Sequence, residues 1–86
     1  MAPQSISWLT LEKGTTAFGS DGEEIGKVAE VLGDRQKDIF SGVAVRPGLL
    51  SSKRFVPAEL IENITTDGLT VALPSTEAEA RLEPYS

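Results

Sequence analysis

Residues 19–48 read GSDGEEIGKVAEVLGDRQKDIFSGVAVRPG, and this stretch decides the fold. Its Asp21-Gly22 pair predicts a tight turn, because glycine reaches positive φ freely and aspartate tolerates the left-handed region. A long strand is expected after this turn, followed by a polar turn over 34–38 and a second strand over 39–46. The stretch therefore predicts two long neighbouring strands.

A helix is the rival interpretation of residues 25–32. Four apolar residues fit the helical i, i+3, i+4, i+7 spacing: Ile25, Val28, Ala29 and Leu32. Against a helix, Ile25 and Val28 are β-branched, and Gly26 would lie one turn into it. We favour a strand. Because Ile25 and Val28 cannot share one face of a regular strand, we expect a bulge at Gly26-Lys27 that bends it.

Composition limits the possible chemistry. The chain has 86 residues and should form one domain that buries about 60% of its unfolded surface. It has no cysteine, which excludes disulfides and thiolate chemistry. It has no histidine, the commonest general base and metal ligand. These absences disfavour most enzyme classes.

Charge and hydropathy limit the possible partners. Thirteen acidic against eight basic residues give a net charge of −5, which repels phosphate backbones and disfavours nucleic acid as a partner. No apolar run approaches the length that spans a membrane, so membrane insertion is not expected. We expect a soluble protein located in the cytoplasm.

Short strands separated by glycine, proline and aspartate turns are predicted for the rest of the chain. The strand over 39–46 has apolar residues on both faces, which is typical of a strand covered on both sides. Asp67-Gly68 predicts a second hairpin, and Leu69, Val71 and Leu73 after it alternate onto one buried face. The pattern favours an all-β fold, specifically a small barrel.

Two short helical pieces are also expected. Pro57 can occupy the first position of one helical turn over 57–61, where no hydrogen-bond partner is needed. Pro74 ends the last strand, and Ser75 is expected to cap a helix over 75–82.

Four motifs occur in order along the chain: DGEEIGKV at 21–28 with EVL at 30–32, FSGVAV at 40–45, RFVPAELI at 54–61 and ITTDGLTV at 64–71. Together they resemble the PRC-barrel domain, the small β-barrel of the photosynthetic reaction-centre H subunit and of the ribosome maturation factor RimM. The resemblance implies a barrel of about six strands and a strand at 25–32, and it covers a core of about 11–73. With the helical tail expected at 75–82, this core makes up a single domain, 1–86. The short acidic form is most similar to stand-alone bacterial versions of unassigned role.

No catalytic, cofactor or metal site is expected. Asp21, Glu23 and Glu24 crowd one turn, but their spacing does not match a calcium loop, and a solvated turn is the better interpretation. The serines have no obvious activating base, and the glycines do not form a phosphate-binding fingerprint. We therefore expect a protein that is not an enzyme.

A candidate partner-binding surface consists of basic residues around two leucines. Its interpretation as a solvated loop is favoured over a surface that docks an acidic partner. The residues are Arg46, Lys53 and Arg54 around Leu49 and Leu50.

Trp8 is expected to close one end of the core, with an exposed binding role as the alternative. Apolar surface at Trp8 and Leu49-Leu50, together with the edges of an imperfectly closed barrel, favours a homodimer or pairing with a larger partner. These features predict a non-catalytic module for protein interaction or assembly. The alternative, by analogy with RimM, is an accessory in RNA processing or ribosome maturation.

Overall fold

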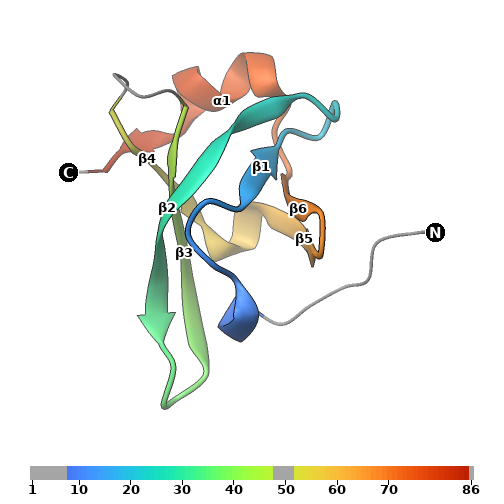
Figure 1. Ribbon diagram of the computed structural model, residues 1–86. Coiled ribbons are helices and arrows are strands. Elements are labelled where there is room, and N and C mark those ends of the chain that lie inside the picture. The colour runs from blue at the N-terminus through green and yellow to red at the C-terminus, as the bar shows by residue number, and fades with distance from the viewer. Residues whose placement is uncertain (1–7, 48–51, 86) are drawn as a thin grey trace.

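Among the described residues, seven strands form one sheet in the order β5-β6-β1-β2-β3-β4-β7 (Figure 1). The computed structural model describes residues 8–47 and 52–85. Neighbouring strands pair antiparallel, except that β1 and β6 pair parallel. The strands are β1 (Thr16–Phe18), β2 (Glu24–Asp34), β3 (Ile39–Arg46), β4 (Arg54–Pro57), β5 (Ile61–Thr65), β6 (Gly68–Val71) and β7 (Glu83–Pro84).

The sheet is open. Within the described residues, strands β5 and β7 end it and do not pair with one another. The all-β fold class is therefore confirmed, whereas the closed barrel of about six strands is not. The seventh strand, β7, was not predicted from the sequence. It holds only two residues against β4, and the backbone N–H of Tyr85 just beyond it donates to the Lys53 carbonyl (2.8 Å).

The strand interpretation of residues 25–32 is correct, because β2 runs through all of them. The expected bulge is wrong in position: Gly26 pairs with Ala17, and Lys27 pairs with both Thr16 and Arg46. The pairing register shifts on either side instead, at residue 25 against β1 and at residue 29 against β3. The shift at residue 25 moves the alternation of side chains between the two faces of the strand by one residue. Ile25 and Val28 therefore both pack against the core.

The core lies between the curled sheet and the helix α1 (Ser75–Arg81), which lies across one end of the sheet (Figure 1). Residues 42–45 of β3 are all buried, which confirms a strand covered on both sides. The predicted buried face of Leu69, Val71 and Leu73 is also confirmed. From the C-terminal segment, Ala78 and Leu82 join the same core.

The expectation that Ser75 caps its own helix is wrong. Pro74 occupies the cap position, and Ser75 is the first helical residue. The carboxylate of Asp21, in the turn between β1 and β2, accepts hydrogen bonds from the Ser75 backbone N–H (3.2 Å) and hydroxyl (2.8 Å). The cap therefore comes from a distant turn, because folding brings that turn to the start of α1.

The two other helical segments are single 3₁₀ turns. The helical turn expected over 57–61 is present as η2 (Ala58–Leu60), after which β5 begins at once. The segment η1 (Trp8–Thr10) precedes the first strand.

Both predicted glycine turns are present. Gly22 has φ 84°, and its N–H donates to the Gly19 carbonyl (3.0 Å). The second loop falls one residue earlier than expected: Thr65 pairs with Gly68 across the two loop residues 66–67. Gly68 has φ 146°, is buried and begins β6.

We expect Gly68→Ala to destabilise the fold much more than Gly22→Ala. Both changes place a side chain at positive φ, which costs about 1 kcal/mol. A Cβ on Gly68 would also overlap the Thr16 carbonyl and press on Phe18, whereas none of the described atoms lies within 4 Å of one on Gly22. Chemical denaturation should give a loss of about 1 kcal/mol for Gly22→Ala and about 3 kcal/mol for Gly68→Ala. Equal losses would contradict the close approach of β1 and β6.

Candidate functional site

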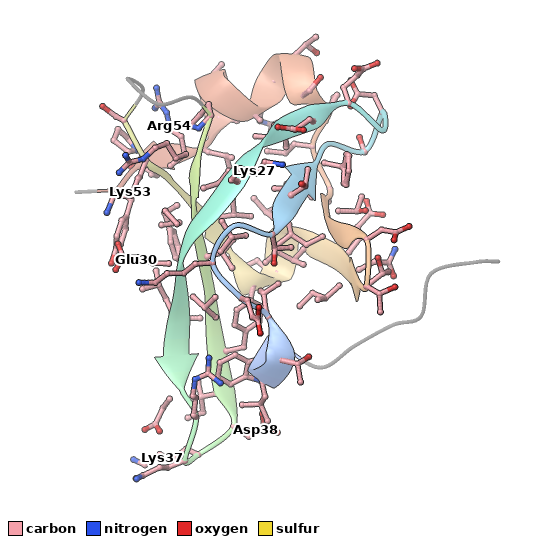
Figure 2. The ribbon with its side chains drawn as sticks, in the orientation of Figure 1. Lys27, Glu30, Lys37, Asp38, Lys53 and Arg54 are labelled. Atoms are coloured by element: carbon pink, nitrogen blue, oxygen red, sulfur yellow. The ribbon has the colours of Figure 1, made fainter. Side chains whose placement is uncertain are left out.

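Two of the predicted basic residues are engaged within the protein. Lys53 Nζ donates to Glu30 Oε2 on β2 (2.8 Å) and lies 5.5 Å from the centre of the Tyr85 ring (Figure 2). This hydrogen bond lowers the pKa of the Glu30 carboxyl below its ordinary value. Arg54 Nη1 reaches the Leu82 carbonyl at the end of α1 (3.4 Å), where the helix dipole favours a positive charge.

The other residues predicted with them are Arg46, Leu49 and Leu50. Arg46 ends β3 and is exposed, and it has no ion pair with another described residue. Leu49 and Leu50 lie outside the described residues. The structure thus brings Lys53 and Arg54 together at the start of β4, where each contacts another part of the same chain.

Trp8 lies apart from this basic group. Its ring stacks on Phe40 with 5.0 Å between the ring centres, and its Nε1 donates to Asp38 Oδ1 (2.8 Å). Figure 2 shows Asp38 near the tip of the β2–β3 hairpin, away from Lys53 and Arg54. Of the predicted partner-binding residues that the structure describes, Trp8 therefore belongs to a different surface from Lys53 and Arg54.

Trp8 instead forms one wall of a groove that sequence reasoning missed. The groove has a volume of about 340 Å³ and is bounded on its other side by the edge strand β5. The sequence contains one signal of this groove: the polar pair Glu62-Asn63 lies between the apolar residues Ile61 and Ile64. The lining residues are Trp8, Phe40, Ala58, Ile61, Glu62, Asn63 and Ile64.

The Trp8 wall is held in place from several directions. Asp38 fixes the indole N–H and Phe40 supports one face of the ring. The Arg35 guanidinium lies 5.9 Å from the ring centre, and its Nη1 donates to the Leu9 carbonyl (2.7 Å). The wall is therefore formed before any partner arrives, which reduces the entropy lost on binding.

The β5 side of the groove is acidic. Glu62 lines it, and Glu59 lies in η2 immediately before β5. Both side chains are exposed. From residue 55 to residue 80 the sequence contains five acidic residues and no lysine or arginine. A positively charged partner is therefore favoured along this edge.

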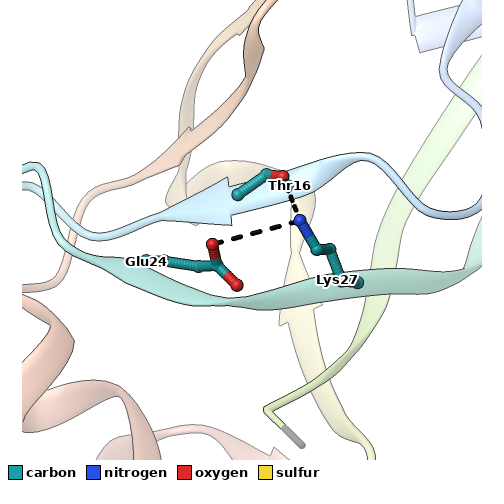
Figure 3. A network of polar contacts seen from close by, with 3 residues as sticks. All are labelled: Thr16, Glu24 and Lys27. Atoms are coloured by element: carbon teal, nitrogen blue, oxygen red, sulfur yellow. Dashed lines mark hydrogen bonds and ion pairs between the residues drawn. The ribbon is translucent and has the colours of Figure 1, made fainter.

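The acidic turn at 21–24 divides its carboxylates among different contacts. Asp21 holds the start of α1, as described above. Glu24 forms an exposed ion pair with Lys27 (3.9 Å), whose Nζ also donates to Thr16 Oγ1 on β1 (2.7 Å; Figure 3).

Within residues 8–47 and 52–85, no three acidic side chains gather into a possible metal site. In the same part of the chain, no helix has the length and apolar character needed to cross a membrane.

The Asp21 contact predicts a pH dependence of stability. The hydrogen bond from the Ser75 hydroxyl lowers the pKa of the Asp21 carboxyl below its ordinary value of 3.8. The charged form therefore stabilises the folded state above that value, and this contribution is lost as the pH falls through the lowered pKa. We expect Asp21→Asn to have a lower Tm than the wild type at pH 7, with the difference shrinking toward pH 3.

Ser75→Ala is the matched variant for this measurement, because it removes the hydroxyl donor and leaves the carboxylate. It should reproduce part of the loss in Tm at pH 7 and reduce the dependence on pH. A difference between wild type and Asp21→Asn that stays constant from pH 7 to pH 3 would contradict the assignment.

Comparison with known proteins identifies the family. The family model described as the PRC-barrel domain matches residues 13–78, which is more than half of the chain. No match was found among curated proteins. The matched range extends from just before β1 into α1, and it includes η2, β5 and the Phe40 side of the groove. The chain therefore belongs to the PRC-barrel domain family.

Proposed function

We propose that this protein is a non-catalytic module that binds another protein during assembly of a complex. PRC-barrel domains are generally non-catalytic and indicate a general role in interaction or assembly. The observation that carries the proposal is the groove between Trp8 and β5. It offers apolar surface beside an open sheet edge, on a wall that is already held in position.

The character of the groove supports binding rather than chemistry. Most of the described residues that line it are apolar, and Glu62 is the one ionisable residue among them. The sequence contains no histidine or cysteine that could act as a base or nucleophile there. A groove of this kind contributes shape, apolar contact and charge to a partner, which are the properties an interaction module uses.

Self-association and a cytoplasmic location belong to the same proposal. We propose that Leu49 and Leu50, which lie outside the described residues, take part in a homodimer or in pairing with a larger partner, and that Arg46 contributes to docking an acidic partner. Lys53 and Arg54 would contribute less, because both already contact other parts of the chain. Trp8 belongs to the separate groove.

Charge favours a protein partner over RNA. The net charge of −5 opposes binding to a phosphate backbone. The acidic β5 side of the groove opposes it further. The alternative role in RNA processing or ribosome maturation rests on likeness to one member of the family, whereas function depends on the particular site.

Affinity capture from a native lysate tests the proposal. The tagged wild-type protein is used as bait at low and at moderate salt, with and without ribonuclease. We expect one protein to be retained in stoichiometric amount under all of these conditions, because apolar contact is less sensitive to salt than ion pairs are. Recovery that disappears after ribonuclease treatment would support the alternative role, and no stoichiometric partner would contradict the proposal.

A further inference from the structure

Strand β5 leaves one side of its backbone without a partner strand among the described residues. It pairs with β6 on its other side, from Ile61 opposite Val71 to Thr65 opposite Gly68. The outward N–H and C=O groups of an edge strand can pair with an extended segment of another chain. This edge therefore offers main-chain hydrogen bonds in addition to the groove beside it.

The groove can accept an apolar side chain from such a segment. Half-buried Phe40, Ile61 and Ile64 line it and also pack against the core, so its floor is continuous with the core. The stacked Trp8 forms the opposite wall. Because successive residues of a strand point to opposite sides, an added strand would place alternate side chains toward this groove.

The negative charge of the β5 edge determines which side chains are favoured at the other positions of the partner segment. Glu62 lies on the edge itself, and Glu59 precedes it by three residues. Asp67 follows in the loop between β5 and β6, and no basic residue occurs from 55 to 80. Lysine or arginine beside the apolar positions would be attracted to these carboxylates.

We propose that the β5 edge binds an extended segment of a partner protein in which apolar residues alternate with lysine or arginine. The segment adds a strand next to β5 and inserts apolar side chains toward the Trp8 wall. This inference rests on the proposed interaction function and specifies its site and the chemistry of the partner.

A second copy of the chain fits this edge less well. Symmetric pairing of two β5 strands would bring two acidic edges together, and like charges placed opposite each other destabilise a sheet. The register of β5 also shifts between Ile61 and Asn63, next to Glu62. Irregularities and charges of this kind oppose edge-to-edge pairing between identical molecules, whereas the same charges attract a basic segment.

A pair of synthetic peptides of about eight residues, the length of an ordinary strand, tests the proposal. One alternates valine with lysine, the other alternates valine with glutamate, and both have blocked termini. We expect only the lysine peptide to bind, shifting the NMR signals of the β5 amides and of the Trp8 indole. Absence of binding, equal binding of both peptides, or shifts confined to β7 or Arg46 would overturn the proposal.

The variant Glu62→Lys tests the contribution of charge. It should weaken binding of the lysine peptide by about fivefold or more, since it replaces an attraction at the edge by a repulsion. Glu83→Lys is the matched control, because it makes the same charge change on β7 at the opposite end of the sheet and should alter affinity less than about twofold. Equal losses for the two variants would show attraction by net charge alone and overturn the proposal.

Trp8→Leu tests the wall while keeping an apolar residue there. It should weaken binding of the lysine peptide while the other NMR signals retain their wild-type dispersion. If Trp8→Leu does not fold, the Glu62→Lys variant tests the proposal in its place, because Glu62 is exposed and does not contribute to the core. Light scattering tests whether a second copy of the chain occupies the edge instead. A wild-type dimer that Glu62→Lys alters would assign the edge to a second copy and overturn the proposal.

The same variants separate this inference from the proposed function. A partner captured equally by the wild type and by Glu62→Lys would leave the interaction function standing and place its site elsewhere. Failure to capture any partner would instead contradict the interaction function itself.

Discussion

The burial of β3 on both faces is the constraint on which the rest of the structure depends. Residues 42–45 are covered completely, so their backbone groups must find partners in β2 on one side and in β4 on the other. Val43 and Val45 lie in the core, and each fully buried valine stabilises the fold by roughly 1.5–3 kcal/mol. A flat sheet could not enclose this strand. The register shifts of β2 provide bends, and α1 adds Ala78 and Leu82 to the core.

An open edge follows from this arrangement and leads to the proposed function. The sheet begins with β5 and ends with the two-residue strand β7. At the β5 end, Phe40 and the isoleucines are packed on one side against the core, while their other side faces the groove with Trp8. The same residues that complete the core thus line the proposed binding surface. The acidic side chains at this edge limit pairing between identical molecules and favour a basic partner.

The sequence predicts the elements well, because strands and turns are encoded by neighbouring residues. Leu69, Val71 and Leu73 alternate, and the glycines at 22 and 68 mark turns, so both features can be read from short windows. The position of the bend in β2 could not be predicted, since it depends on pairing with β1 and β3. Very short strands also cannot be predicted from sequence. Strand β7 has only two residues, too few for an alternating pattern, and it forms by pairing with β4.

The candidate site could not be predicted for the same physical reason. Asp21 and Ser75 are 54 positions apart, and Trp8 and Asp38 are 30 apart. No periodicity links such pairs, although each determines how a surface is built. Conversely, Arg46, Lys53 and Arg54 are close in sequence and were grouped for that reason, whereas folding pairs Lys53 with Glu30 on another strand.

Hydrogen exchange resolved by residue tests the open edge most directly. We expect the amides of 42–45 in β3 to exchange slowly, because they are buried between two paired strands, and the amides of β5 to fall into two classes. Those that pair with β6 should be protected, and those that point outward should exchange rapidly. Uniformly slow exchange along β5 in the isolated protein would show that the edge is already occupied, and would contradict its role as a docking strand.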